Sequence, residues 1–283
     1  MPIAYPAILD LKTEGQAFAW RDRETMLYAL GIGMGSDPLD MDELPFVYEN
    51  NLKAVPTLAT VVAWGAGPLG KTGINYLMVV HGEQSVTFHK PMPTEAQIIA
   101  DSRIAGAYDK GPGKGAVIYT ETVIKDAKSG EPIATLLGST FARGDGGFGG
   151  PSDGAPTPHE VPSRAPDRSI DIPTRPDQAL IYRLSGDRNP LHSDPSIATA
   201  AGFPRPILHG LCTYGITCRA VLQTYADYDP AKIKSHAVRF SSPVYPGETI
   251  TVDMWKDGDT ISFEARVKAR DVTVIKNGKT VLG

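Results

Sequence analysis

The sequence LHGLCTYGITCRAVLQTYA, residues 208–226, decides the fold class of this chain. Its apolar positions recur at helical spacing, at Leu211, Tyr214, Cys218, Val221, Leu222 and Tyr225. This periodicity predicts one long helix from Leu208 to Ala226. Strands are predicted after it at about 235–243, 249–256, 260–269 and 272–276, with turns at Asp257-Gly258 and Asn277-Gly278. A long helix followed by antiparallel strands indicates an α+β layer, in which a sheet wraps around a helix.

The first half of the chain has the same order of elements. A helix is predicted over 56–64, and strands near 84–90, 97–108, 116–126 and 133–142. Three short matches link the halves at offsets of 154, 150 and 152 residues: Tyr28-Ala-Leu30 with Tyr182-Arg-Leu184, Pro56-Thr-Leu58 with Pro206-Ile-Leu208, and Val86-Thr-Phe88 with Val238-Arg-Phe240. Their common order and similar offset indicate a duplicated domain.

The halves are separated by a segment dense in glycine and proline. Residues 144–176 have no sustained apolar period, which is typical of a connection. The predicted organisation is therefore an N-terminal repeat over 1–145, a linker over 146–175 and a C-terminal repeat over 176–283.

The composition excludes several classes of protein. The 283 residues carry a net charge of −4, which gives no reason to expect a nucleic-acid partner. No stretch is long and apolar enough to span a membrane, and the N-terminus lacks the pattern of a signal peptide. Cys212 and Cys218 lie about 9 Å apart on the predicted helix, too far for a disulfide. We therefore expect reduced core cysteines in a cytoplasmic protein.

The segment Tyr182-Arg-Leu-Ser-Gly-Asp-Arg-Asn-Pro-Leu-His192 contains the candidate catalytic groups. Pro190 forbids a regular helix here, so a tight turn can aim Asp187 and His192 at one point. A carboxylate and an imidazole on one water suit general acid–base chemistry near neutral pH. We expect His192 to draw the water proton, although the sequence leaves open which group is the acid. Asn189 is expected to position the water or Asp187.

The start of the long helix supplies a second candidate group. N–H groups at a helix start are unpaired and carry positive partial charge, and glycine allows close approach to the backbone. We therefore expect the Gly210 N–H to stabilise a developing oxyanion, and His209 to support the site. Asp187, His192 and His209 lack a recognisable metal-ligand spacing, so no metal is expected.

The chain resembles the MaoC-like hydratase 2 family of enoyl-CoA hydratases. The resemblance rests on 182–192 and on its continuation through Ala201-Gly-Phe203 to Pro206-Ile-Leu-His-Gly-Leu-Cys-Thr-Tyr214. Supporting matches are His81-Gly-Glu-Gln84, Gly146-Gly-Phe-Gly-Gly150 and Pro243-Val-Tyr-Pro-Gly247. Within the family, the chain resembles the hydratase domain of the peroxisomal multifunctional enzyme.

The resemblance implies a double hot-dog fold, with two repeats that each wrap an antiparallel sheet around a long central helix. The implied activity is reversible, (R)-specific hydration of trans-2-enoyl-CoA in fatty acid β-oxidation, with coenzyme A as part of the substrate and no cofactor. The family's catalytic aspartate, asparagine and histidine match Asp187, Asn189 and His192. Glu49, in Tyr48-Glu49, matches a motif near the site and receives a supporting role.

The first half lacks the catalytic set, because no Asp-x-Asn-Pro-x-His segment follows Tyr28, and Ala59 and Thr60 align with His209 and Gly210. We expect this half to bind the acyl tail and its short helix to leave room for a long or branched chain. The last strand also looks short, and a homodimer is expected.

Two other functions remain open. Hot-dog folds also host acyl-CoA thioesterases, and a non-catalytic acyl-CoA binding protein is the third possibility. The sequence does not identify the acyl chain, which could be straight, branched, aromatic or a sterol side chain.

Overall fold

The computed structural model describes residues 3–283, so the first two residues of the predicted N-terminal repeat lie outside it. The strands are β1 (Lys12–Trp20), β2 (Val79–Phe88), β3 (Ala96–Asp109), β4 (Ala116–Asp126), β5 (Pro132–Ala142), β6 (Arg168–Pro173), β7 (Ile233–Phe240), β8 (Thr249–Asp257), β9 (Thr260–Val267) and β10 (Val272–Leu282). The α-helices are α1 (Asp22–Gly31), α2 (Leu44–Val47), α3 (Gln178–Tyr182), α4 (Pro195–Ala200) and α5 (Gly210–Tyr225). The 3₁₀ helices are η1 (Ala7–Asp10), η2 (Pro56–Thr60), η3 (Pro68–Lys71), η4 (Tyr76–Met78), η5 (Arg183–Ser185), η6 (Pro190–His192), η7 (Pro230–Lys232) and η8 (Lys268–Arg270).

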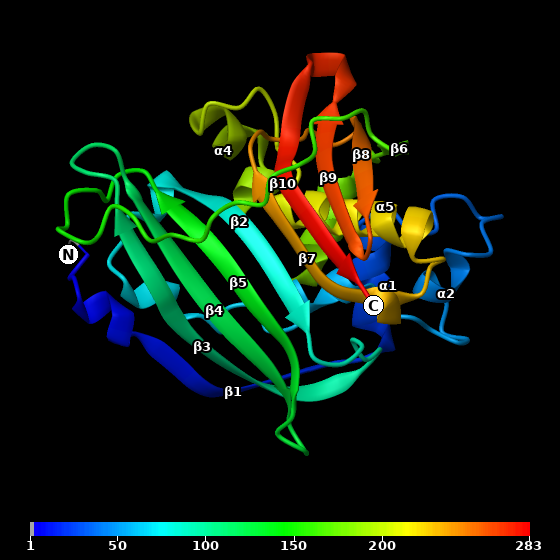
Figure 1. Ribbon diagram of the computed structural model, residues 1–283, viewed down its shortest axis with the longest axis horizontal. Coiled ribbons are helices and arrows are strands. Elements are labelled where there is room, and N and C mark those ends of the chain that lie inside the picture. The colour runs from blue at the N-terminus through cyan, green and yellow to red at the C-terminus, as the bar shows by residue number, and fades with distance from the viewer. Residues whose placement is uncertain (1–2) are drawn as a thin grey trace.

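These strands form one antiparallel ten-stranded sheet in the order β1-β3-β4-β5-β2-β7-β10-β9-β8-β6 (Figure 1). Each half of the chain supplies five neighbouring strands in equivalent order. The halves meet where β2 pairs with β7, from Glu83 opposite Arg239 to Thr87 opposite Ser235. The predicted α+β class and the double hot-dog fold are confirmed.

Helix α5 lies against the sheet of the C-terminal half and is almost entirely buried. The periodicity placed this helix correctly to within two residues at each end. Its Tyr214 is fully buried and donates a hydrogen bond from its hydroxyl to the His236 carbonyl of β7, at 2.8 Å. Cys212 and Cys218 are free and buried in α5, as predicted. The helix is thereby fixed to the strand at the centre of the sheet.

The prediction of a long central helix in the first half was wrong. Residues 56–60 form only the 3₁₀ helix η2, and turns follow it. The N–H groups of Val61 and Trp64 donate three residues back, to Leu58 and Val61. Gly65 then takes a left-handed conformation with φ 84°, which ends any helix. The equivalent of α5 is therefore missing from the N-terminal repeat.

The expected turn at Asn277-Gly278 was also wrong, and the last strand is long rather than short. β10 continues through this pair with a register shift against both neighbours. Asn277 has φ 55°, and a Cβ at Gly278 would lie 2.3 Å from Phe263 Cδ2. The pair makes a β-bulge, in which Asn277 takes the left-handed conformation and Gly278 leaves room for Phe263.

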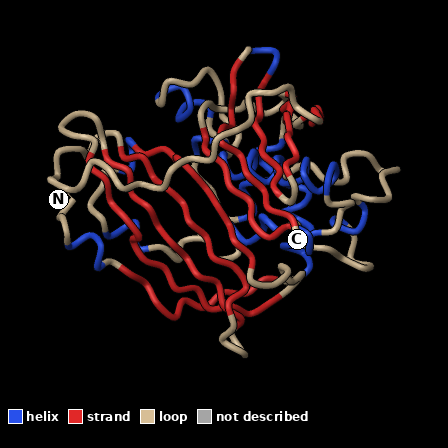
Figure 2. The backbone as a smooth tube through the Cα atoms, in the orientation of Figure 1, coloured by secondary structure: helices blue, strands red, loops and turns tan. Residues whose placement is uncertain are grey.

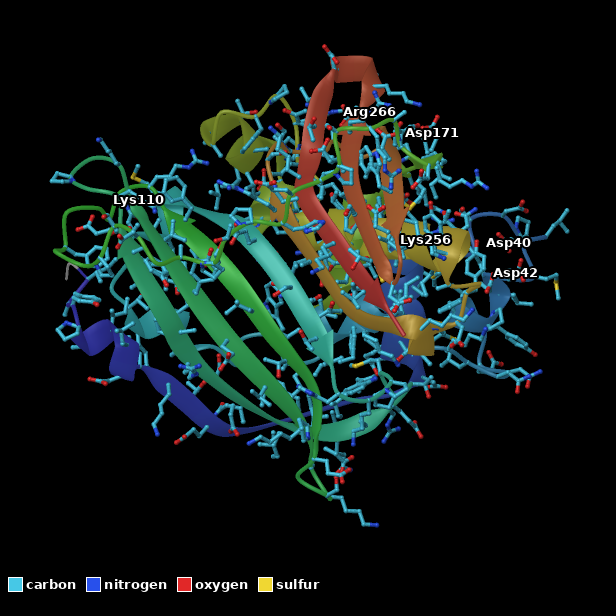
Figure 3. The ribbon with its side chains drawn as sticks, viewed as in Figure 1. Asp40, Asp42, Lys110, Asp171, Lys256 and Arg266 are labelled. Atoms are coloured by element: carbon cyan, nitrogen blue, oxygen red, sulfur yellow. The ribbon has the colours of Figure 1, made fainter. Side chains whose placement is uncertain are left out.

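The sequence patterns missed the strands β1 and β6 and the short helices α1, α2, α3 and α4. β6 lies inside the predicted linker and forms the edge of the sheet beside β8. There Asp171 accepts hydrogen bonds from Thr251 Oγ1 at 2.5 Å and from Lys268 Nζ at 3.1 Å. Figure 3 labels Asp171 on this edge strand and Arg266 on β9. A short, charged edge strand resists pairing with other chains.

The rest of the linker crosses the outer face of the sheet (Figure 2). The His159 ring bonds the Ser262 hydroxyl at 2.8 Å, and the Arg164 carbonyl accepts from Trp255 Nε1 at 2.7 Å. The linker is therefore attached to the C-terminal repeat along its path. None of the described helices has the length and apolarity to cross a membrane.

A buried ion pair joins the halves on the helix side. Figure 3 shows Asp40 and Asp42 on the outside of the loop before α2, whereas the Glu43 side chain is only 2 % exposed. Glu43 Oε1 accepts from Arg219 Nε of α5 at 2.5 Å, and its Oε2 accepts from Gly35 N at 2.9 Å. This pair fixes the loop over 35–43 to the buried helix.

We expect Arg219→Leu to lower the free energy of unfolding by about 3–5 kcal/mol, because it leaves the Glu43 carboxylate buried and unpaired. Adding Glu43→Gln should recover part of this loss. Urea denaturation measures both changes. Arg23→Leu is the control, because the Arg23–Glu24 pair is 86 % and 38 % exposed and should not move the midpoint. An unchanged midpoint in Arg219→Leu would contradict the importance of the pair.

Candidate active site

The segment 182–192 folds as two short helical turns joined by a left-handed glycine. η5 ends at Gly186, which has φ 137°. Asp187 Oδ1 accepts a hydrogen bond from Asn189 N, and Asn189 Oδ1 accepts one from Leu191 N, both at 3.0 Å. These side chains hold the turn closed through their own backbone, as Asp and Asn commonly do. The turn begins η6 at Pro190 and brings His192 back toward Asp187.

His192 is held with its reactive nitrogen toward Asp187. Its Nδ1 lies 2.9 Å from the Ile207 carbonyl, and a carbonyl can only accept, so Nδ1 carries the proton in the neutral ring. Nε2 is then unprotonated, 3.9 Å from Asp187 Oδ2. One water molecule can bridge a separation of this size. The geometry brings the two predicted catalytic groups together.

Burial lowers the pKa of His192 below its ordinary value of 6.5, because it disfavours the charged ring. The Ile207 carbonyl and the Asp187 carboxylate oppose this shift. His192 is therefore neutral at neutral pH, and its Nε2 lone pair is available as a general base.

His209 contacts both Asp187 and His192. Its Nε2–H donates to the Asp187 carbonyl at 3.0 Å, and its ring stacks on His192 with centroids 3.7 Å apart and planes 27° apart. Burial, and then the nearby His192, lowers the pKa of His209 to about 3. This neutral ring fits the supporting role that the sequence assigned to it.

Gly210 is the first residue of α5, directly after His209. No described oxygen accepts a hydrogen bond from its N–H, as expected at the start of a helix. A Cβ at this position would lie 3.3 Å from Cε1 of Phe240. Only glycine fits here without displacing the ring, and its N–H remains free to bind an anion.

For two predicted residues, no hydrogen bond or ion pair of the described chain joins the side chain to Asp187 or His192. The Asn189 side chain is exposed and serves the turn, and Glu49 is exposed on the loop after α2 without a polar contact among residues 3–283. Two contributors were missed: the Ile207 carbonyl, which orients His192, and the Phe240 ring beside Gly210. A backbone carbonyl leaves no sequence signal, whereas Phe240 lies in the repeated Val-Arg-Phe match.

Asp187, His192 and His209 each offer a potential metal ligand, and within the described chain these atoms lie within 4.8 Å of one another. A carboxylate with two imidazoles is a donor set that suits a transition metal. However, the lone pairs of an imidazole lie in its plane. Two rings stacked at 27° with centroids 3.7 Å apart hold these lone pairs in separate, nearly parallel planes, so they do not meet at one point. The donors do not fit a metal in this arrangement.

Comparison with known proteins gives matches over most of the chain. The family described as MFE-2 hydratase 2 N-terminal domain matches residues 18–144, and the family described as MaoC like domain matches residues 158–278. The chain is 43 % identical to 3-hydroxyacyl-thioester dehydratase Y of Mycobacterium tuberculosis, over 89 % of this chain and 87 % of that protein. It is 40 % identical to enoyl-CoA hydratase ChsH3 of the same organism, over 98 % of both.

A solved structure agrees with these matches. The crystal structure of a MaoC-like dehydratase from Phytophthora capsici superposes with a TM-score of 0.87 at 34 % identity, covering 98 % of this chain and 96 % of that one. Similarity at this level extends across both repeats and the linker between them.

We expect the carbon-bound ring protons of His192 to titrate in an NMR experiment with a midpoint below the ordinary 6.5, because burial favours the neutral ring. Asp187→Asn should lower the midpoint further, because the carboxylate favours the protonated ring. His192→Gln assigns the resonance. A midpoint at or above the ordinary value would contradict this account of the site.

Proposed function

Because the chain belongs to the MaoC-like hydratase 2 family, we propose that it is a hydro-lyase that adds water reversibly to trans-2-enoyl-CoA and forms (R)-3-hydroxyacyl-CoA. One observation carries the proposal: the unprotonated Nε2 of His192 faces the Asp187 carboxylate across 3.9 Å. A base and a carboxylate on one water suit the addition of hydroxide and a proton to neighbouring carbons.

The steps follow from the groups present. His192 Nε2 accepts a proton from the water while the oxygen bonds to C3. The electrons of the double bond move toward the thioester, whose oxygen gains negative charge. The accepted proton passes to C2 through Asp187, so the pair returns to its starting state after each turnover. His209 acts as a positioning residue, because its hydrogen bond to the Asp187 carbonyl fixes the turn.

The Gly210 N–H donates to the thioester oxygen. It lies at the start of a 16-residue helix, where the backbone dipoles add positive partial charge. A donor that is already in position stabilises the oxyanion without reorganisation during the reaction.

The remaining expectations are part of the same proposal. The N-terminal repeat binds the acyl tail, since it has no equivalent of the Asp187–His192 pair. The protein acts in the cytoplasm, in fatty acid β-oxidation, as a homodimer and without a metal or redox cofactor. The cytoplasmic location rests on the N-terminal sequence and the unpaired cysteines, and the other statements rest on the sequence resemblance.

The reaction is tested with crotonyl-CoA and trans-2-decenoyl-CoA, by following the enoyl absorbance and assigning product stereochemistry. Asp187→Asn and His192→Ala should each lower kcat by about 10²–10⁴-fold, the usual range for acid–base groups. Asp22→Asn, an exposed carboxylate on α1, is the matched control. Release of free coenzyme A would indicate a thioesterase instead, and binding without turnover an acyl-CoA binding protein.

Gly210→Ala should lower kcat, by up to about a hundredfold, because contact with Phe240 displaces the N–H from the thioester oxygen. Adding Phe240→Leu removes the steric contact and should restore part of kcat. Steady-state kinetics with crotonyl-CoA measures both variants. Full activity in Gly210→Ala would rule out a role for the free space at this position.

A further inference from the structure

A tryptophan of the N-terminal repeat lies directly against the turn that carries Asp187. A Cβ at Gly186 would lie 3.0 Å from Trp64 Cγ, 3.1 Å from its Cβ and 3.4 Å from its Cδ2. The indole therefore packs on the backbone of Gly186, the residue before Asp187. Gly186 combines this close approach with φ 137°, so no other residue fits without strain.

The Trp64 side chain is nevertheless 43 % exposed. The two other tryptophans, Trp20 and Trp255, are 5 % and 7 % exposed. Trp64 thus has an exposed aromatic surface beside the Asp187–His192 pair. Unlike Trp20 and Trp255, it is not buried in the core.

The missing helix of the N-terminal repeat explains this exposure. At the offset of 150 residues that relates Pro56 to Pro206, Trp64 corresponds to Tyr214. Tyr214 lies inside α5 and is fully buried. The chain after Trp64 instead turns away at Gly65, so no further helical turn covers the indole. The 3₁₀ helix η2 packs against α5 of the other repeat. Trp64, which no helical turn covers, therefore reaches the turn that carries Asp187.

We propose that Trp64 is a specificity-determining residue, which the N-terminal repeat supplies to the active site of the C-terminal repeat. The proposal rests on the enoyl-CoA hydratase function. The indole packs on Gly186 and presents its exposed surface to the acyl carbons beyond C3, while Asp187 and His192 act on C2 and C3. The face of the indole is apolar, so its ligand is the hydrocarbon part of the thioester.

Kinetics with two chain lengths distinguish this role from a structural one. Trp64→Ala should raise the KM of trans-2-decenoyl-CoA by about tenfold, the effect of losing one aromatic contact, and change the KM of crotonyl-CoA much less. Trp64→Phe keeps an aromatic ring and should stay near wild type. Tyr76→Ala is the matched control, because Tyr76 is 51 % exposed in the same connection. An equal loss of kcat with both substrates, or no change in either KM, would overturn the proposal.

Binding gives a readout without turnover. Saturated decanoyl-CoA cannot be hydrated, but it should change the fluorescence of Trp64, and free coenzyme A should not. Trp64→Phe should abolish the change, because the other tryptophans are buried. A fluorescence response in a protein that hydrates no enoyl-CoA would support the acyl contact and remove the proposed reaction. Hydration with no fluorescence response and unchanged KM values would support the proposed reaction and overturn the role of Trp64.

Discussion

The pairing of β2 with β7 is the constraint on which the molecule depends. It makes one sheet from two repeats and brings the helix side of the N-terminal half against α5. The buried Glu43–Arg219 ion pair also joins the two halves, because it fixes the loop over 35–43 to α5. The candidate site lies at this boundary, because Gly186, next to Asp187, packs against Trp64 of the N-terminal repeat. Neither repeat alone has all the groups that surround these residues.

Within the site, the backbone does much of the positioning. The Ile207 carbonyl selects the tautomer of His192, and the Asp187 carbonyl is held by His209. Asp187 thus receives a hydrogen bond at its main chain and another at its carboxylate, from Asn189 N. Burial then keeps both imidazoles neutral. The neutral ring of His192 results here from the burial of an imidazole whose direction is already fixed, rather than from a strong charge nearby.

The sequence predicted the features that depend on local pattern. Periodicity located α5, and β4 was placed over its full length at 116–126. Features decided by distant contacts were missed or wrong. Asn277-Gly278 has the composition of a turn, but its conformation is set by pairing with both neighbouring strands. The motif identified Asp187 and His192, whose side chains the structure brings together, whereas Glu49 is exposed on a loop. The Ile207 carbonyl has no side-chain signature at all.

The linker between the repeats has a consequence for symmetry. Two identical subunits that paired through β2 and β7 would carry every substitution twice, so each helix start would have to serve the same purpose. A covalent connection across 146–175 removes this requirement. Thr60 and Gly210 occupy equivalent positions but differ, and one helix could be lost while its counterpart was kept. Because the repeats are joined in one chain, two halves with the same architecture can differ in the residues and helices at equivalent positions.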